Sequence, residues 1–402
     1  MVHWRANLFS LSRGNLADQF IASLTELFRE YALGSSREDF VLTAAMLLPA
    51  LILQRPHRRS TTTDHIECLQ RRLPLWETAK GINELLKEGK CIQHHLRTSL
   101  SRPPKRSIAK RFTDCMVWGK VKDAIRLLSN SQRGGVLSLN ERVNIGTDCE
   151  KSVLEALLEK HPKSQPPFPE TLVASPGPDS DTSSSTIFQA LDADAIRRAA
   201  LRTFGSAGPS GVDAAAWRRW CTGYGKKSTA LCKSIALIAR KLCSCYVDPK
   251  GLVAFNACRL LPLHKCPGIR PIGVTEVCRR VIGKAVLGIV KQDVLEAVAG
   301  RQFCAGLVSG CEAAVHCMSQ IFDDSEAALF VDATNAFNSL NRASALSNVR
   351  TICPALAPIL INTYRSPGSL FVNGTTIQSV EGTTQGDPLG MVMYAIGGQP
   401  LI

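Results

Sequence analysis

The chain has 402 residues, of which 45% are hydrophobic and 20% are charged. This balance is typical of a folded globular protein and excludes an intrinsically disordered chain. The formal net charge of +14 is unevenly distributed. Residues 55–126 contain 17 Lys and Arg against 7 Asp and Glu, and residues 197–300 contain 18 against 5, whereas residues 301–402 contain 4 against 7. Two basic blocks of this kind favour a polyanionic partner, the alternative being a generally basic surface.

Cysteine usage and hydropathy indicate an intracellular protein, nuclear or cytoplasmic. The 15 cysteines include no Cys-x-x-Cys pair, so we expect free thiols that pack as small core residues in a reducing compartment. The beginning of the chain lacks the pattern of a secretory signal. The longest apolar run, Phe40–Leu53, contains Pro49 and is too short to cross a bilayer. We therefore expect no transmembrane segment and no membrane partner.

The first 160 residues are predicted to be mainly helical. Apolar residues recur at helical spacing over 14–34, 40–53 and 76–100, and a further helix is expected over 109–129. Residues 161–187 are rich in proline and serine and are predicted to form a linker or mobile loop. A second structured region then covers residues 188–402.

This second region mixes helices and strands, which predicts an α+β fold. Asp192 is the expected N-cap of a helix that runs to Phe204. Further helices are expected over Ala214–Trp220, Leu231–Cys245, Val277–Val298 and Cys311–Phe322. Strands are expected over Arg259–Leu263 and Ile269–Val274 around a Pro267-Gly268 turn, over Ala327–Val331, and over Leu370–Val372 and Thr376–Val380 around Asn373-Gly374.

The segment "ALFVDATNAFNSLNR" places Asp332 directly after an apolar stretch. A strand that ends in an aspartate fixes the carboxylate rigidly at the edge of a sheet, which suits Mg²⁺. Taken alone, the aspartate has an alternative role as the cap of the helix that follows.

Two further segments carry polar residues in turns. In "EGTTQGDPLGM", Gln385 offers a donor and an acceptor, and Gly386 allows a close approach of the backbone to a ligand; the alternative is an ordinary turn between a strand and a helix. In "RLLPLHKCPGIRPIGV", a hairpin carries Lys265 near its turn and Arg270 on the returning strand. Such cations can hold a triphosphate, or they can simply face solvent.

The order of these three segments resembles the reverse transcriptase family, most closely the polymerases of non-LTR (LINE-like) retrotransposons. "QFCAGLVSGCEAAVH" is similar to the family's Gln-Gly element, and "AGPSGVDAAAW" to the segment that opens the domain. The resemblance implies that residues 188–402 form the fingers and an incomplete palm of a right-hand polymerase, without the thumb. It also implies an RNA template, a DNA primer, deoxynucleoside triphosphates and Mg²⁺ as partners and cofactor.

The resemblance implies roles for individual residues in nucleotidyl transfer by two metal ions. Asp332 would bind both ions and the Ala333 carbonyl would bind one of them. Phe337 would lie under the sugar and reject a 2′-hydroxyl group. The remaining residues would bind the nucleotide, Lys265 and Arg270 through its triphosphate and Gln385 and Gly386 as walls of its pocket.

The sequence departs from the family pattern after this point. The family pattern continues with an aromatic-x-Asp-Asp motif, which does not follow Asp332 in the 402 residues. We therefore expect a fragment of an RNA-directed DNA polymerase that is inactive on its own. The alternative is a non-catalytic nucleic-acid-binding remnant or domesticated protein. A helical interaction protein unrelated to polymerases would leave the order of the motifs unexplained.

Overall fold

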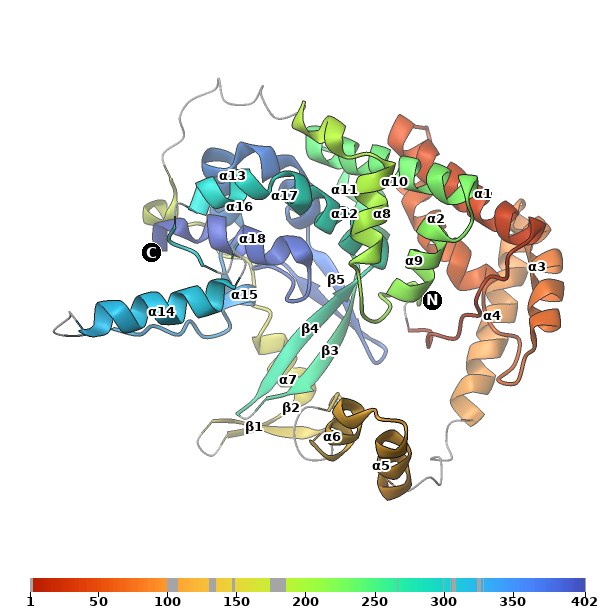
Figure 1. The fold of residues 1–402 in the computed structure, drawn as a ribbon, viewed down its shortest axis with the longest axis horizontal. Coiled ribbons are helices and arrows are strands. Elements are labelled where there is room, and N and C mark those ends of the chain that lie inside the picture. Colours follow the sequence, from red (N-terminus) through yellow and green to blue (C-terminus); the bar gives the residue numbers. More distant parts are fainter. Residues whose placement is uncertain are drawn as a thin grey trace.

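The protein is described by a computed structural model (Figure 1). It describes residues 3–99, 108–129, 135–146, 149–173, 186–265, 267–298, 300–303, 305, 309–323, 327 and 329–401. Helices predominate and strands are few, so the predicted α+β class is confirmed. Among the described residues, each helix is too short or too polar to cross a membrane.

The α-helices and 3₁₀ helices have the following bounds. The α-helices are α1 (Asn15–Leu33), α2 (Glu38–Ile52), α3 (Thr62–Trp76), α4 (Ala79–Ser99), α5 (Ile108–Val117), α6 (Val121–Ser129), α7 (Val153–Glu159), α8 (Ala193–Leu201), α9 (Ala214–Thr222), α10 (Lys226–Ser244), α11 (Pro249–Asn256), α12 (Val277–Ile289), α13 (Lys291–Val298), α14 (Gly310–Asp323), α15 (Ala336–Ser339), α16 (Arg342–Ile352), α17 (Ala357–Tyr364) and α18 (Pro388–Gly397). The 3₁₀ helices are η1 (Pro169–Thr171), η3 (Ile187–Ala190), η4 (Pro354–Leu356) and η5 (Gln399–Leu401).

Two small sheets complete the fold. The strands are β1 (Arg142–Gly146), β2 (Cys149–Ser152), β3 (Cys258–His264), β4 (Ile269–Thr275), β5 (Gly368–Val372) and β6 (Thr375–Ser379). β1 and β2 form an antiparallel pair, and the other four follow the order β4-β3-β5-β6. Both predicted hairpins are confirmed as β3–β4 and β5–β6, and β5 joins β3 in parallel.

Short polar side chains fix the starts of many helices. Asp192, Asp213, Asn341 and Asp387 each accept a hydrogen bond from a backbone N–H in the first turn of α8, α9, α16 and α18. Satisfying a backbone donor that has no partner within the helix stabilises the helix by about 1 kcal/mol. The N-cap predicted at Asp192 is confirmed, although the helix ends at Leu201 rather than Phe204.

One large hydrophobic core joins the N-terminal helices to the second region. Phe20 and Phe28 of α1 are fully buried. Their rings lie 5.4 Å from Trp220 and 6.1 Å from Trp217 of α9. A smaller core lies between α7 and one face of the four-stranded sheet. In Figure 1, α1–α4 lie at one side of the body and α14 projects from the opposite side.

Several elements differ from the predictions. The helix expected over 109–129 is divided at Gly119, which has a φ of 66°, and the helix expected over Val277–Val298 is divided at Val290. Two strands, β1 and β2, lie in the region predicted to be mainly helical.

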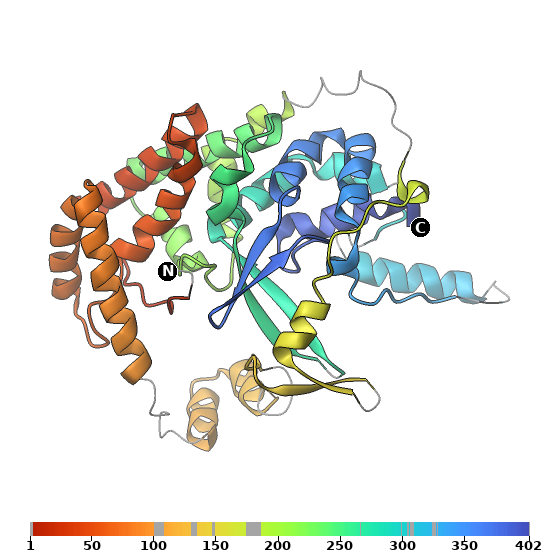
Figure 2. The same cartoon turned by 180° about the vertical axis from the view of Figure 1, so that it is seen from behind.

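The described part of the predicted linker is held against the protein. Figure 2 shows the chain after α7 passing beside α16. The Val173 N–H donates to Asn348 Oδ1 at 2.9 Å, and Thr171 Oγ1 lies 2.9 Å from Ser344 Oγ. This part is therefore anchored on α16 rather than free, while residues 174–185 lie outside the described residues.

Candidate functional site

The β3–β4 hairpin and the loop that carries Gln385 and Gly386 are in direct contact. The Gly273 N–H of β4 donates to the Gln385 carbonyl at 3.0 Å. Gly386 has a φ of 114°, and a Cβ atom there would lie 2.7 Å from the Gly273 carbonyl oxygen. At Gly273 a Cβ would lie 2.3 Å from Thr384 Cγ2. Gly386 is therefore required for this approach of strand and loop, whereas a side chain at Gly273 would require the Thr384 side chain to move.

Phe337 belongs to the same assembly. Its carbonyl oxygen accepts the Thr383 N–H at 2.6 Å, and its half-buried ring lies 5.2 Å from that of Tyr394 in α18. Phe337 thus contacts the loop of Gln385 and Gly386 through its backbone, while its ring lies beside α18. These three residues were predicted to share a nucleotide pocket.

The space between these elements is nearly filled. A cavity of about 10 Å³ lies between β3, β4, β5 and the loop of Gln385, and His161 and Asn338 contribute to its lining. This volume holds one water molecule at most. Burial, followed by the neighbouring charges of Arg342 and Lys160, lowers the pKa of His161. The cavity is too small to hold a nucleotide.

A buried ion pair fixes the C-terminal end of the loop, where α18 begins. Asp387, fully buried, accepts hydrogen bonds from Arg279 of α12 and from the Tyr364 hydroxyl, the latter at 2.7 Å. Burial alone would lower the pKa of Arg279, but the adjacent Asp387 carboxylate outweighs it and raises that pKa. Burial also raises the pKa of Tyr364 well above its usual range. Asp387 therefore has a structural role at the start of α18.

A second buried arginine anchors the other end of the loop. Arg342 donates to the carbonyl oxygens of Ser379, Glu381 and Gly382 at 2.8–3.0 Å. Its backbone N–H donates to the Glu381 carboxylate at 2.6 Å. Burial lowers the pKa of Arg342 to about 10. The loop is thus fixed at both ends by charged side chains within the protein.

The predicted triphosphate ligands lie on the hairpin. Lys265 and Arg270 are both exposed, and the Lys265 N–H closes the turn on the Gly268 carbonyl at 3.1 Å. Burial, and then the charge of Lys265, lowers the pKa of Lys160 at the end of α7. The Lys160 carbonyl accepts a hydrogen bond from Asn335 Nδ2 at 2.9 Å. The segment that follows Asp332 and Ala333 therefore lies near a cationic hairpin tip.

The strand predicted before Asp332 is wrong for the described residues of this segment. Residues 327 and 329–333 belong to no strand, and Leu329, Phe330 and Val331 are 89%, 75% and 82% exposed. A strand forms only when its backbone groups find a partner, and these residues pair with no strand among those described. Asp332 and Ala333 are exposed.

The carboxylate side chains do not assemble a magnesium site. Within the described ranges, no three His, Cys, Asp or Glu side chains lie close enough to hold a metal ion together. Mg²⁺ requires several oxygen ligands in a fixed octahedral geometry, which one exposed carboxylate does not provide. The described residues do not fit the ion that the resemblance implies.

Sequence reasoning missed the residues that hold the loop. Arg279 lies in α12, which carries two further basic residues, and Arg342 closes the motif that contains Asp332. Arginine is rarely fully buried unless it is paired, and nothing nearby in the sequence distinguishes these two from exposed arginines. Their partners Asp387 and Glu381 are distant in sequence, so the pairing itself had no signal. No protein-family model and no curated protein matches the sequence.

Proposed function

We propose that this chain is the fingers and an incomplete palm of an RNA-directed DNA polymerase of the non-LTR retrotransposon type. On its own it binds nucleic acid and does not extend a primer. The observation that carries the proposal is the contact between β4 and the loop of Gln385 and Gly386. It joins the loop to the cationic hairpin, and Phe337 contacts the same loop through the Thr383 N–H. The sequence resemblance assigns these three parts to one nucleotide site.

The distribution of charge supports the proposal that the chain binds nucleic acid. The basic block 197–300 includes the β3–β4 hairpin, whose Lys265 and Arg270 are exposed. Within the described part of the chain, neither cation forms an ion pair, so both are available to phosphate oxygens. A phosphate contact from each would release counterions when a strand binds.

The exposure of Asp332 supports the proposal that the chain does not extend a primer on its own. Phosphoryl transfer in such polymerases depends on metal ions held by several carboxylates. Asp332 lies outside a sheet, and no metal-binding group forms among the described residues. Lys265, Arg270, Gln385, Gly386 and Phe337 would bind a nucleotide, whereas Asp332 would need further carboxylates to hold Mg²⁺. A non-catalytic nucleic-acid-binding protein is the second candidate, favoured by the same observation on Asp332.

Salt dependence tests this function. We expect the chain to bind single-stranded and duplex oligonucleotides with little sequence preference and with an affinity that falls steeply with salt. Each phosphate contact contributes about 0.7–0.9 to the slope of log K against log salt. Fluorescence anisotropy across a salt series measures this slope, and Lys265→Gln/Arg270→Gln should reduce it by about 1–2. Tight binding that is insensitive to salt would reject the proposal.

A further inference from the structure

A large cationic cavity lies away from the loop of Gln385. Its volume is about 590 Å³, and its walls come from residues 6–10, the segment after α2, the loop before α9 and the start of β3. Four arginines line it, together with a single carboxylate, Asp213. The arginines are Arg55, Arg58, Arg219 and Arg259.

Four arginines and one carboxylate line the cavity, which therefore keeps an excess of positive charge. The Asp213 carboxylate already accepts the Ala216 N–H of α9 at 2.8 Å. None of the four arginines forms an ion pair with another described residue. Arg219 donates to the Ser10 hydroxyl at 2.8 Å, which leaves most of its donors unused. Gathering like charges is unfavourable unless an anion joins them.

Arg259 carries the clearest signal. Its Nε atom is buried and has no hydrogen-bond partner among the described residues. Burial lowers the pKa of this guanidinium, and the nearby Glu276 carboxylate partly opposes the effect. Leaving a buried donor without a partner is energetically unfavourable. The residue as a whole is half-buried and lines the cavity, so a ligand there would lie against its side chain.

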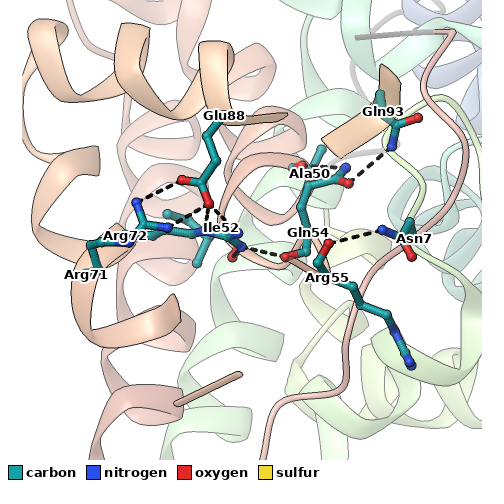
Figure 3. Close-up of polar contacts among 9 residues, drawn as sticks. All are labelled: Asn7, Ala50, Ile52, Gln54, Arg55, Arg71, Arg72, Glu88 and Gln93. Atoms are coloured by element: carbon teal, nitrogen blue, oxygen red, sulfur yellow. Dashed lines mark hydrogen bonds and ion pairs between the residues drawn. The ribbon is translucent and has the colours of Figure 1, made fainter. Parts of the chain in front are cut away.

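Arg55 is held at the cavity by a polar network in the N-terminal helices (Figure 3). The buried Arg72 donates to the carbonyl oxygens of Ile52 and Gln54 at 2.8 and 2.6 Å and to Glu88 at 2.7 Å. Gln93 donates to Gln54 Oε1 at 3.1 Å. These bonds fix the chain after α2.

The same network leaves the Arg55 side chain free to reach the cavity. Asn7 Nδ2 donates to the Arg55 carbonyl at 3.2 Å, and Figure 3 shows the guanidinium pointing away from the network. Its Nε donates to the Leu8 carbonyl at 3.3 Å. The backbone is fixed while the terminal nitrogens stay available, which is the arrangement of a built binding site.

We propose that this cavity binds the phosphate group of a nucleotide-sized ligand. The guanidinium group matches phosphate oxygens with paired hydrogen bonds, and the volume lies within the range of small-molecule sites. The ligand is a free nucleotide or one nucleotide of a bound strand. The proposal deepens the proposed function without depending on it, because the cavity is distinct from the hairpin tip and the loop of Gln385.

The sheet gives a physical link to a bound strand. Arg259 pairs with Val274 and Arg270 pairs with Leu263 in the β3–β4 ladder. Residues that alternate along a strand share a face, so Arg259 and Arg270 lie on the same side of the sheet. That side is opposite the one that packs on α7. Arg270 pairs with a residue four positions along β3 from Arg259, which is a distance of about 13 Å along the β-strand. A single bound nucleic-acid chain would therefore contact both arginines.

Two pocket substitutions test the site with the full 402-residue chain. Isothermal titration calorimetry would measure binding of inorganic phosphate, deoxyadenosine monophosphate and a 12-nucleotide single strand. Arg58→Gln/Arg259→Gln should weaken phosphate-ligand binding by about tenfold or more, since two charge-assisted hydrogen bonds are lost. Arg58→Glu, at an exposed position where packing is unaffected, should weaken it as well.

The control removes the same charge elsewhere. Arg37→Gln/Arg142→Gln replaces two side chains that are 73% and 67% exposed and lie outside the cavity, and should leave mononucleotide affinity within about twofold. Loss of mononucleotide binding in the pocket variant alone identifies a free nucleotide as ligand, and loss of only oligonucleotide binding identifies a strand. Equal losses in the pocket and control variants would overturn the site. So would pocket variants that bind both the mononucleotide and the oligonucleotide as the unmodified chain does; salt-dependent oligonucleotide binding in that case would leave the proposed function standing.

Discussion

Two parts of the predicted catalytic site are built in opposite ways. The loop of Gln385 and Gly386 is fixed at both ends by the buried arginines Arg279 and Arg342, and by backbone bonds to β4. The segment that leads to Asp332 has exposed apolar side chains and no strand partner among the described residues. The segments predicted to bind the nucleotide are therefore held in contact with β4, while the segment predicted to bind the metal is not held in a sheet.

The difference shows what each kind of site requires. A backbone group or a buried charge needs only one or two neighbouring partners in space. Residues of α12, α16 and α18 supply these partners for the loop. A metal site needs several carboxylates held in fixed positions by rigid elements. Because the side chains of Leu329, Phe330 and Val331 are exposed, they do not hold the segment before Asp332 against the rest of the described residues.

The largest expected effect concerns the anchored side. Arg279→Ala removes the partner of the buried Asp387 and leaves an unpaired charge in the core. Such a change costs about 3–5 kcal/mol of the free energy of unfolding, measurable by urea denaturation. Arg270→Ala, at an exposed arginine on the hairpin, is the control and should change it by less than about 0.5 kcal/mol. Equal changes in the free energy of unfolding for the two variants would contradict the role of Arg279 as an anchor of the loop.

A buried carboxylate near Arg280 and Arg259 adds a pH dependence. Burial raises the pKa of Glu276 to about 7, while its hydrogen bonds from Ser210 and the charges of Arg280 and Arg259 partly oppose this. A raised acid pKa means that the unfolded state loses its proton first, so stability falls as pH rises from about 4.5 to about 7. Relative to Glu276→Gln, the chain should lose about 3 kcal/mol across this window. Thermal unfolding at a series of pH values measures this loss. If the chain and Glu276→Gln showed parallel dependence of Tm on pH, the raised pKa of Glu276 would be contradicted.

The smallest effect is expected on the exposed side. Phe330→Ser should change the free energy of unfolding by less than about 0.5 kcal/mol, because its side chain is already 75% exposed. Leu389→Ala, at a side chain 2% exposed behind the loop of Gln385, should cost about 2–5 kcal/mol. Denaturation of both variants measures the contrast. A loss above about 1.5 kcal/mol at Phe330 would mean that the segment is packed after all.

Local patterns predicted much of this fold, and long-range partners account for the failures. The Asn373-Gly374 turn, with φ values of 41° and 91°, and the Asp192 cap depend on neighbouring residues, so the sequence shows them directly. The strand before Asp332 failed because a strand depends on a partner, which an apolar run does not specify. Likewise, the contacts of Arg342 with Ser379 and Glu381 depend on how distant segments meet.

The cationic cavity illustrates the same limit. Its four arginines come from three separate parts of the sequence, and only the fold brings them together. The basic blocks predicted an anion partner in general, and neither block singles out Arg259 or Arg55. Their significance follows from burial and from the missing partner of Arg259 Nε.

Primer extension tests the central claim most directly. The 402-residue chain would be incubated with an RNA template, an annealed DNA primer, deoxynucleoside triphosphates and Mg²⁺, with Asp332→Ala in parallel and an active reverse transcriptase as positive control. We predict binding of the template and primer without added nucleotides, for both the chain and the variant. Extension by the chain that Asp332→Ala abolishes would show an assembled metal site and contradict this account.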